Sequence, residues 1–103
     1  MHEEEVMIFK LVNGQELIAK VVEGHSEGWV VSHSRVFMPK QDPRSPQGWV
    51  MTLAPYIVAL MNTENVAYTI LRSGVAAYTA DIPEDLLKEY KQAVSGLILA
   101  KGL

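Results

Sequence analysis

The sequence predicts a mostly β protein: a small, strongly bent antiparallel barrel of about five to six strands, followed by one C-terminal α-helix. Three observations predict this fold class. Asn13-Gly14 joins two apolar runs, and this is the strongest short-range signal for a β-hairpin. Short runs of β-forming residues then recur at hairpin-like spacing as far as Thr79. Beyond Thr79 the apolar residues recur with a helical period instead.

The first two predicted strands cover Val6–Val12 and Glu16–Glu23. The second strand alternates Leu17, Ala19 and Val21 on one face with Ile18, Lys20 and Val22 on the other. Both faces carry apolar residues, which is typical of a strand that lies between a core and a covering element or a neighbouring subunit.

A third strand is predicted from Trp29 to Met38, with a bend at Ser32-His33-Ser34. Such a bend suits a small barrel, because its strands must curl. Residues Pro39–Gly48 hold three prolines among polar residues, so they predict a long loop without a regular element. We expect mobility or a partner contact in this loop.

The stretch Trp49–Met61 is apolar and rich in β-formers, and Pro55 within it indicates an edge or a bulge. Val66–Leu71 and Val75–Thr79 predict two short strands, joined as a hairpin by Arg72-Ser73-Gly74. The strands therefore follow one another as in a meander.

The last segment, about residues 82–100, predicts an amphipathic helix. Asp81 and Glu84 have the spacing of a capping box, and Pro83 suits a first helical turn. Gly96 lowers helix stability by about 1 kcal/mol relative to Ala, so we expect fraying or an early end there. One helical face collects the apolar residues Leu86, Leu87, Tyr90, Ala93, Val94, Leu97 and Ile98.

Composition limits the class of protein. A chain of 103 residues predicts a single domain over residues 1–103, and chains of this size are often stabilised by association. No apolar run reaches the length of a membrane span, and the start Met-His-Glu-Glu-Glu lacks the order of a signal peptide, so we expect a soluble cytoplasmic protein. The absence of cysteine excludes disulfides and thiolate metal sites.

Charge and motif content bear on function. A net charge of −3 argues against a protein that coats DNA by bulk attraction, so any nucleic-acid site must be local. The sequence has no nucleophile-base constellation and no Gly-rich phosphate loop, so we expect a protein that is not an enzyme. His25 and His33 have no convincing third ligand, so we expect neither a metal nor a cofactor.

The hairpin from Phe9 to Glu23 resembles the opening of the Sm and LSm proteins, which include bacterial Hfq. The family's glycine and the apolar and small positions after it fall on Gly14, Leu17, Ala19 and Val21. The stretch Ile70-Leu71-Arg72-Ser73-Gly74-Val75 is similar to the family's apolar-Arg-Gly-apolar motif, with Ser73 inserted.

Three further segments resemble small Sm-like proteins encoded by tailed phages of marine bacteria. They are Asn13-Gly14-Gln15-Glu16-Leu17-Ile18, Leu53-Ala54-Pro55-Tyr56, and Ile82-Pro83-Glu84-Asp85-Leu86 with the later Tyr90. The resemblance implies an SH3-like Sm barrel that forms a homo-oligomeric ring of about five to seven subunits. It also implies a phage protein located in the cytoplasm of the host cell, with no membrane partner.

For function, the resemblance implies binding of single-stranded nucleic acid, RNA in the first place, at a rim formed by Arg72, Gly74 and the turn from His25 to Trp29. His25, Glu27 and Trp29 stand where the family has Asp, a stacking residue and Asn. Each site residue also has a structural alternative. Arg72 can be a solvated turn residue or an inter-subunit ion pair, and Trp29 can cap the core. The alternative function is a protein-interaction or assembly module that binds no nucleic acid.

Overall fold

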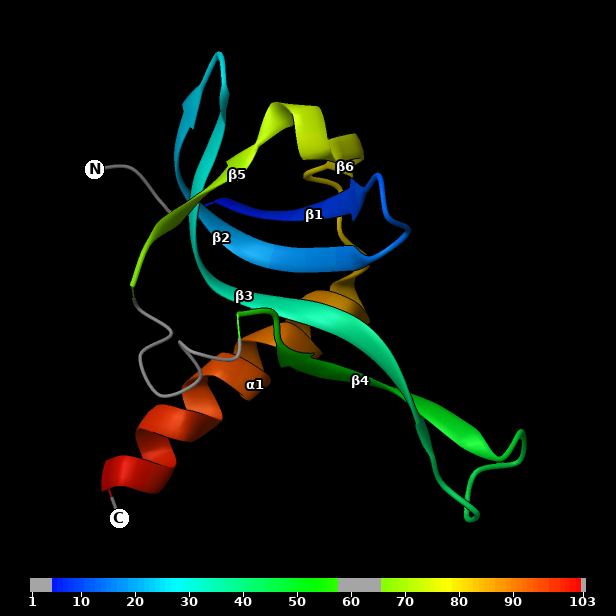
Figure 1. The fold of residues 1–103 in the computed structure, drawn as a ribbon. Helices are drawn as coiled ribbons and strands as arrows, with labels where there is room; N and C mark the ends of the chain where they lie inside the picture. The colour runs from blue at the N-terminus through cyan, green and yellow to red at the C-terminus, as the bar shows by residue number, and fades with distance from the viewer. Residues whose placement is uncertain (1–4, 58–65, 103) are drawn as a thin grey trace.

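The computed structural model describes residues 5–57 and 66–102 (Figure 1). Its described part is mostly β, with six strands and one helix near the C-terminus, which confirms the predicted class at this level. In chain order the elements are β1 (Glu5–Leu11), β2 (Glu16–His25), β3 (Gly28–Gln41), β4 (Trp49–Pro55), β5 (Tyr68–Leu71), the 3-10 turn η2 (Arg72–Gly74), β6 (Val75–Thr79) and α1 (Glu84–Gly102).

All strand pairs are antiparallel, and the sheet runs in the order β4-β3-β2-β1-β6, with β5 paired to β3. The first four strands thus form the predicted meander. The sheet is strongly curved (Figure 1). Closure into a barrel would need its edge strands to pair, but among the described strands β5 and β6 do not pair with each other. A closed barrel is therefore not confirmed.

The β1–β2 hairpin turns at Asn13 and Gly14, as predicted. Gly14 has φ of 94°, a left-handed conformation that glycine adopts without steric cost. Its N–H donates to the Leu11 carbonyl at 2.9 Å, and the Gln15 N–H donates to the Asn13 side chain at 3.0 Å. The turn sets a register in which Ile8 faces Ile18 across the pair.

β3 bends where the sequence predicted it. His33 has φ of 52°, and the pairing with β2 shifts register between Ile18 and Lys20, so that β3 carries a bulge there. The bulge turns the strand, and as a result its first half pairs with β5 and its second half with β4.

The irregular loop predicted over Pro39–Gly48 is confirmed for residues 42–48 and was wrong for residues 39–41. β3 continues to Gln41, and Gln41 pairs with Trp49. Pro39 is tolerated because β3 beyond Phe37 pairs with β4 and with no other described strand, so the nitrogen that lacks a hydrogen can face the other side. Residues 42–48 form a compact turn with three backbone hydrogen bonds, each 3.0 Å long: Asp42 N–H to Gly48 O, Ser45 N–H to Asp42 O, and Gly48 N–H to Ser45 O.

The predicted hairpin between the last two strands was also wrong. β5 pairs with β3 and β6 pairs with β1, while η2 carries the chain from one to the other. A 3-10 turn redirects the chain sideways, whereas a two-residue hairpin turn would send it straight back. β4 is the outermost strand of the sheet order, which agrees with the edge position that Pro55 indicated, and it ends at Pro55. Residues 58–61 of that predicted stretch lie outside the described residues.

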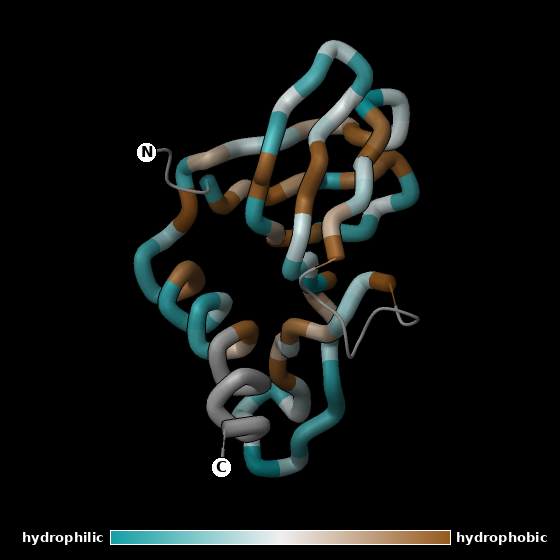
Figure 2. Tube along the Cα trace, turned by 90° about the vertical axis from the view of Figure 1, so that its left-hand side faces the viewer, coloured by the Kyte–Doolittle hydropathy of each residue, from teal (hydrophilic) through white to brown (hydrophobic). Residues whose placement is uncertain are grey.

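Two apolar clusters hold the fold together. The first fills the concave side of the curled sheet and consists of Met7, Phe9, Leu11, Leu17, Ala19, Trp29, Val31, Val36 and Ile70. The second lies under α1, where Ile18, Tyr90 and Val94 are buried and Phe37 and Leu53 pack against them. Apolar and polar stretches alternate along the strands (Figure 2). The two-faced character predicted for the second strand is confirmed, since Leu17 enters the first cluster and Ile18 the second.

α1 runs from Glu84 through Gly96 to Gly102, so the early end expected at Gly96 is not observed. Two buried polar groups fasten it to the sheet. The Tyr90 hydroxyl donates to the His33 carbonyl at 2.7 Å, and Arg35 donates to the Leu53 and Ala93 carbonyls at 3.3 and 3.4 Å. The side chains of Leu97 and Ile98 lie outside the described part. None of the helices described is long and apolar enough to cross a membrane.

Candidate nucleic-acid interface

Arg72 starts η2 and fastens the turn between β2 and β3. Its backbone N–H donates to the Glu27 carbonyl at 2.8 Å. Its side chain donates from Nε to the Ser26 carbonyl and from Nη2 to the His25 carbonyl, both at 3.1 Å. Three successive carbonyls of the turn are therefore bound by one residue from a distant part of the chain.

The same guanidinium lies over Trp29, with Cζ 4.3 Å from the ring centroid. Trp29 is only 6% exposed. Its ring makes edge contacts with Phe9 and Tyr78 at centroid distances of 5.1 and 4.8 Å. The cation is attracted by the face of the indole. Trp29 thus belongs to the core and supports Arg72 from beneath.

His25 ends β2 next to Arg72 and has an exposed side chain. Its Nε2 lies 3.6 Å from the Glu23 carboxylate, a contact that is ionic only when the imidazole is protonated. Exposed Glu27 follows in the same turn. The surroundings of Arg72 therefore carry two carboxylates and are not a purely basic patch.

Gly74 ends η2 and contacts the β1–β2 hairpin. Its carbonyl accepts a hydrogen bond from the Val12 N–H at 3.0 Å. A Cβ at this position would meet no atom within 4 Å. Of the four predicted site residues, the fold brings Arg72, His25 and Trp29 together, while Gly74 lies against the β1–β2 turn.

Sequence reasoning assigned Gly28 only to a turn and missed its structural importance. A Cβ there would lie 2.0 Å from the Ile70 carbonyl oxygen, because β3 and β5 approach closely beside Trp29. The turn-forming Gly24–Gly28 cluster is the only signal in the sequence, and it does not reveal which strand comes near.

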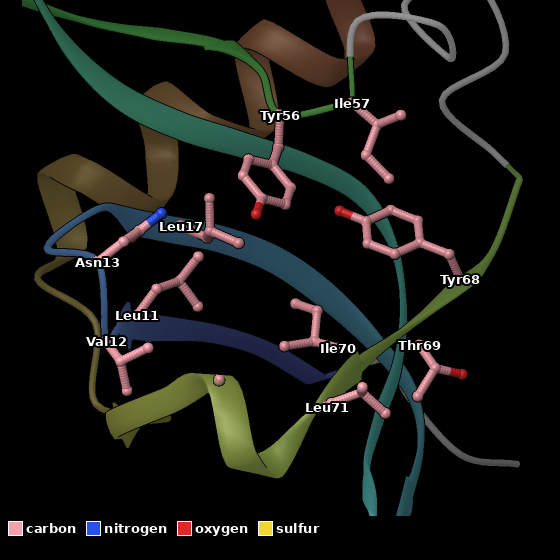
Figure 3. Close-up of a pocket in the computed structure, with 11 residues that line it drawn as sticks. Leu11, Val12, Asn13, Leu17, Tyr56, Ile57, Tyr68, Thr69, Ile70 and Leu71 are labelled. Atoms are coloured by element: carbon pink, nitrogen blue, oxygen red, sulfur yellow. The ribbon is translucent and has the colours of Figure 1, made fainter.

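A hollow of about 380 Å³ opens at one end of the curled sheet, between the β1–β2 turn, β5 and η2 (Figure 3). Leu11, Leu17 and Ile70 line it together with Tyr56 and Tyr68. The Tyr68 hydroxyl donates to Ser34 Oγ. Burial raises the pKa of Tyr68, the hydrogen bond between Tyr68 and Ser34 opposes this shift, and neighbouring Tyr56 adds to it.

Comparison with known proteins leaves the family open. No family model and no curated protein matches this sequence. The resemblance to Sm proteins therefore stays a prediction. Within residues 5–57 and 66–102, no group of three His, Cys, Asp or Glu side chains is placed to hold a metal ion.

Proposed function

We propose that this chain is a non-catalytic, ring-forming Sm-like protein that binds single-stranded nucleic acid, in the first place RNA, at Arg72. The observation that carries the proposal is the stacking of the Arg72 guanidinium on Trp29 beside His25. It joins two segments that the sequence resemblance had separately assigned to one nucleic-acid site.

The chemistry of an arginine held in this way suits a base. Nε and one hydrogen of Nη2 are engaged by the turn, which orients the plane of the guanidinium. Arg72 is nevertheless an exposed residue, so the face turned away from Trp29 is open to a ligand. A planar cation of this kind stacks on the flat faces of bases and also donates hydrogen bonds to phosphate.

Ring formation would raise the apparent affinity for nucleic acid, because one assembly would carry several copies of a weak site. β5 and β6 each have a single partner among the described strands, β3 and β1 respectively, so each leaves one edge open. Pairing of such edges between copies is head-to-tail, and it gives a closed ring when the rotation closes. Several identical sites around one ring act together through effective concentration.

The test compares Arg72→Ala with Lys10→Ala, since Lys10 is an exposed basic residue of β1 that pairs with Glu16 and belongs to no proposed contact. Fluorescence anisotropy with single-stranded RNA and DNA at low salt should detect binding by the wild type and by Lys10→Ala. Arg72→Ala should bind at least about tenfold more weakly. Absence of binding by the wild type, or equal loss in both variants, would contradict the proposal.

A second candidate is an assembly module that binds protein and no nucleic acid. It is favoured by Glu23 and Glu27 beside Arg72, since carboxylates repel phosphate, and by the net charge of −3. It predicts purified protein free of nucleic acid, judged by the ratio of absorbance at about 260 and 280 nm, and partner capture that persists in high salt. Co-purifying RNA that is released by salt would count against it.

A further inference from the structure

The two-stranded arm formed by residues 38–52, called the arm below, projects beyond the rest of the sheet (Figure 1). β2 ends its pairing with β3 at Val36, so none of the described strands lies beside the arm as a third strand. Three of its large apolar side chains are about half exposed: Met38 at 49%, Trp49 at 43% and Met51 at 51%.

One face of the arm continues the surface that α1 covers. In a pair of antiparallel strands, the side chains of two directly opposite residues lie on the same face of the sheet. Every second residue pair along the strands has its side chains on that same face. The pairs Phe37–Leu53, Pro39–Met51 and Gln41–Trp49 follow this rule. Phe37 and Leu53 pack beneath α1, whereas Met51 and Trp49 extend the same apolar strip outward without cover.

The arm is held in shape before any partner arrives. The Ser45 hydroxyl donates to the Trp49 carbonyl at 2.9 Å, and the Thr52 hydroxyl donates to the Met38 carbonyl at 2.9 Å. The Arg44 N–H donates to the Asp42 side chain at 3.0 Å. A preformed surface loses little conformational entropy on binding. The strip is therefore better suited to docking than a loose loop would be.

The charges of the arm and of the α1 start are opposite. The arm carries Lys40 and Arg44 with a single carboxylate, Asp42, and the Arg44 side chain is 92% exposed. Asp81 before α1 and the first two turns of the helix expose four carboxylates and one lysine: Asp81, Glu84, Asp85, Glu89 and Lys88.

The start of α1 also offers a partly apolar receptor. A hollow of about 250 Å³ is lined by Val6, Ala80, Ile82 and Leu87 together with the charged residues Glu5 and Lys91. It has room for one large apolar side chain. The start of α1 thus combines a partly apolar hollow with exposed carboxylates nearby in the sequence, while the arm combines an apolar strip with a basic tip.

We propose that the arm of one copy docks at the start of α1 of a second copy, with Trp49 and Met51 against the hollow and the two basic residues of the arm facing the exposed carboxylates of the α1 start. The inference rests on the self-association in the proposed function and names a contact beyond the pairing of strand edges. Apolar burial would supply the affinity and the charges would set the orientation.

The natural lack of cysteine allows a direct test by crosslinking. Gln41→Cys lies beside Trp49 on the strip, and Ala80→Cys lies at the hollow. A mixture of the two single variants under mild oxidation should give a disulfide-linked dimer on a non-reducing gel. Gln41→Cys mixed with Ser26→Cys, in the distant β2–β3 turn, is the matched control and should give none.

A second measurement compares the dissociation of the assembly in variants that change either the apolar strip of the arm or the charges of the proposed contact. Trp49→Ser should raise the concentration at which the assembly dissociates by about tenfold or more. Arg44→Glu should weaken assembly, and Glu84→Arg added to it should restore part of the loss. Far-ultraviolet circular dichroism would establish that each variant is folded.

The outcomes separate the two proposals. If the wild type assembles but the mixed Gln41→Cys and Ala80→Cys variants give no crosslink, or if Trp49→Ser does not weaken assembly, the arm contact is overturned and the ring is left intact. Self-crosslinking of Gln41→Cys alone would mean that arms meet arms, which also overturns it. A monomeric wild type overturns both proposals, whereas failure to bind RNA affects only the proposed function.

Discussion

The guanidinium of Arg72 lies 4.3 Å above the ring of Trp29 while its nitrogens bind the carbonyls of His25 and Ser26. One side chain therefore joins the β5–β6 connection to the β2–β3 turn and to the core. Any ligand that stacks on Arg72 meets a group that is already oriented, so binding costs little side-chain entropy.

Replacement of Arg72 by Ala should destabilise the fold as well as the site. It removes two side-chain hydrogen bonds and a cation–π contact, and we expect a loss of about 1–2 kcal/mol in the free energy of unfolding. Urea denaturation followed by tryptophan fluorescence measures this loss. Arg44→Ala is the control and should stay within about 0.5 kcal/mol, since its ion pair with Asp42 is exposed. Equal stability of the two variants would show that Arg72 does not fasten the turn.

Gly28→Ala should be among the most damaging single changes in the sheet. The added Cβ would lie 2.0 Å from the Ile70 carbonyl oxygen, so β5 must move away from β3. We expect a loss above about 2 kcal/mol, measured by thermal denaturation. Gly74→Ala meets no atom within 4 Å and should change stability by less than about 0.5 kcal/mol. A melting temperature unchanged in Gly28→Ala would mean that the two strands are further apart.

His33 tests the bulge that bends β3. Its φ of 52° is costly for a β-branched residue, so His33→Val should lose about 1–2 kcal/mol, part of it from the contact between the His33 ring and Ser32. His33→Gly accepts this φ and should keep or raise stability. Chemical denaturation of both variants provides the comparison. A Val variant as stable as the Gly variant would place the bend elsewhere.

Tyr68 should make stability depend on alkaline pH. Burial raises its pKa above the unfolded value of 10.0, which favours the neutral phenol in the folded state. The contribution of Tyr68 to the free energy of unfolding is fully present below pH 10.0 and is lost as pH rises through the pKa of the folded state. The reason is that the unfolded chain releases this proton at a lower pH than the folded chain. Urea titrations between about pH 9 and 11 should show a smaller decline for Tyr68→Phe than for the wild type. Parallel declines in the two proteins would contradict this.

Local signals in the sequence predicted the parts of the fold that depend on neighbouring residues. The Asn13-Gly14 turn, the two-faced strand with Leu17 and Ile18, and the helix with Tyr90 on its buried side all follow from turn chemistry and periodicity. The predictions that were wrong concern strand pairing between residues far apart in the sequence. Nothing local indicates that β5 returns to the first half of β3, or that β3 continues past Pro39 because one side is open.

The candidate site shows the same division. The resemblance singled out Arg72, His25 and Trp29, and the fold brings these three together. The sequence did not show whether Trp29 contacts a nucleic acid directly or packs in the core and supports Arg72. Its burial depends on Phe9 and Tyr78, which come from opposite ends of the sheet-forming part of the chain.

Self-association is the central claim, and the mass of the protein in solution tests it most directly. Light scattering coupled to size exclusion should give a closed assembly of about five to seven copies of the 11.5 kDa chain at micromolar concentration. A mass of 11.5 kDa, that of a single chain, under the same conditions would contradict the ring and with it the arm contact.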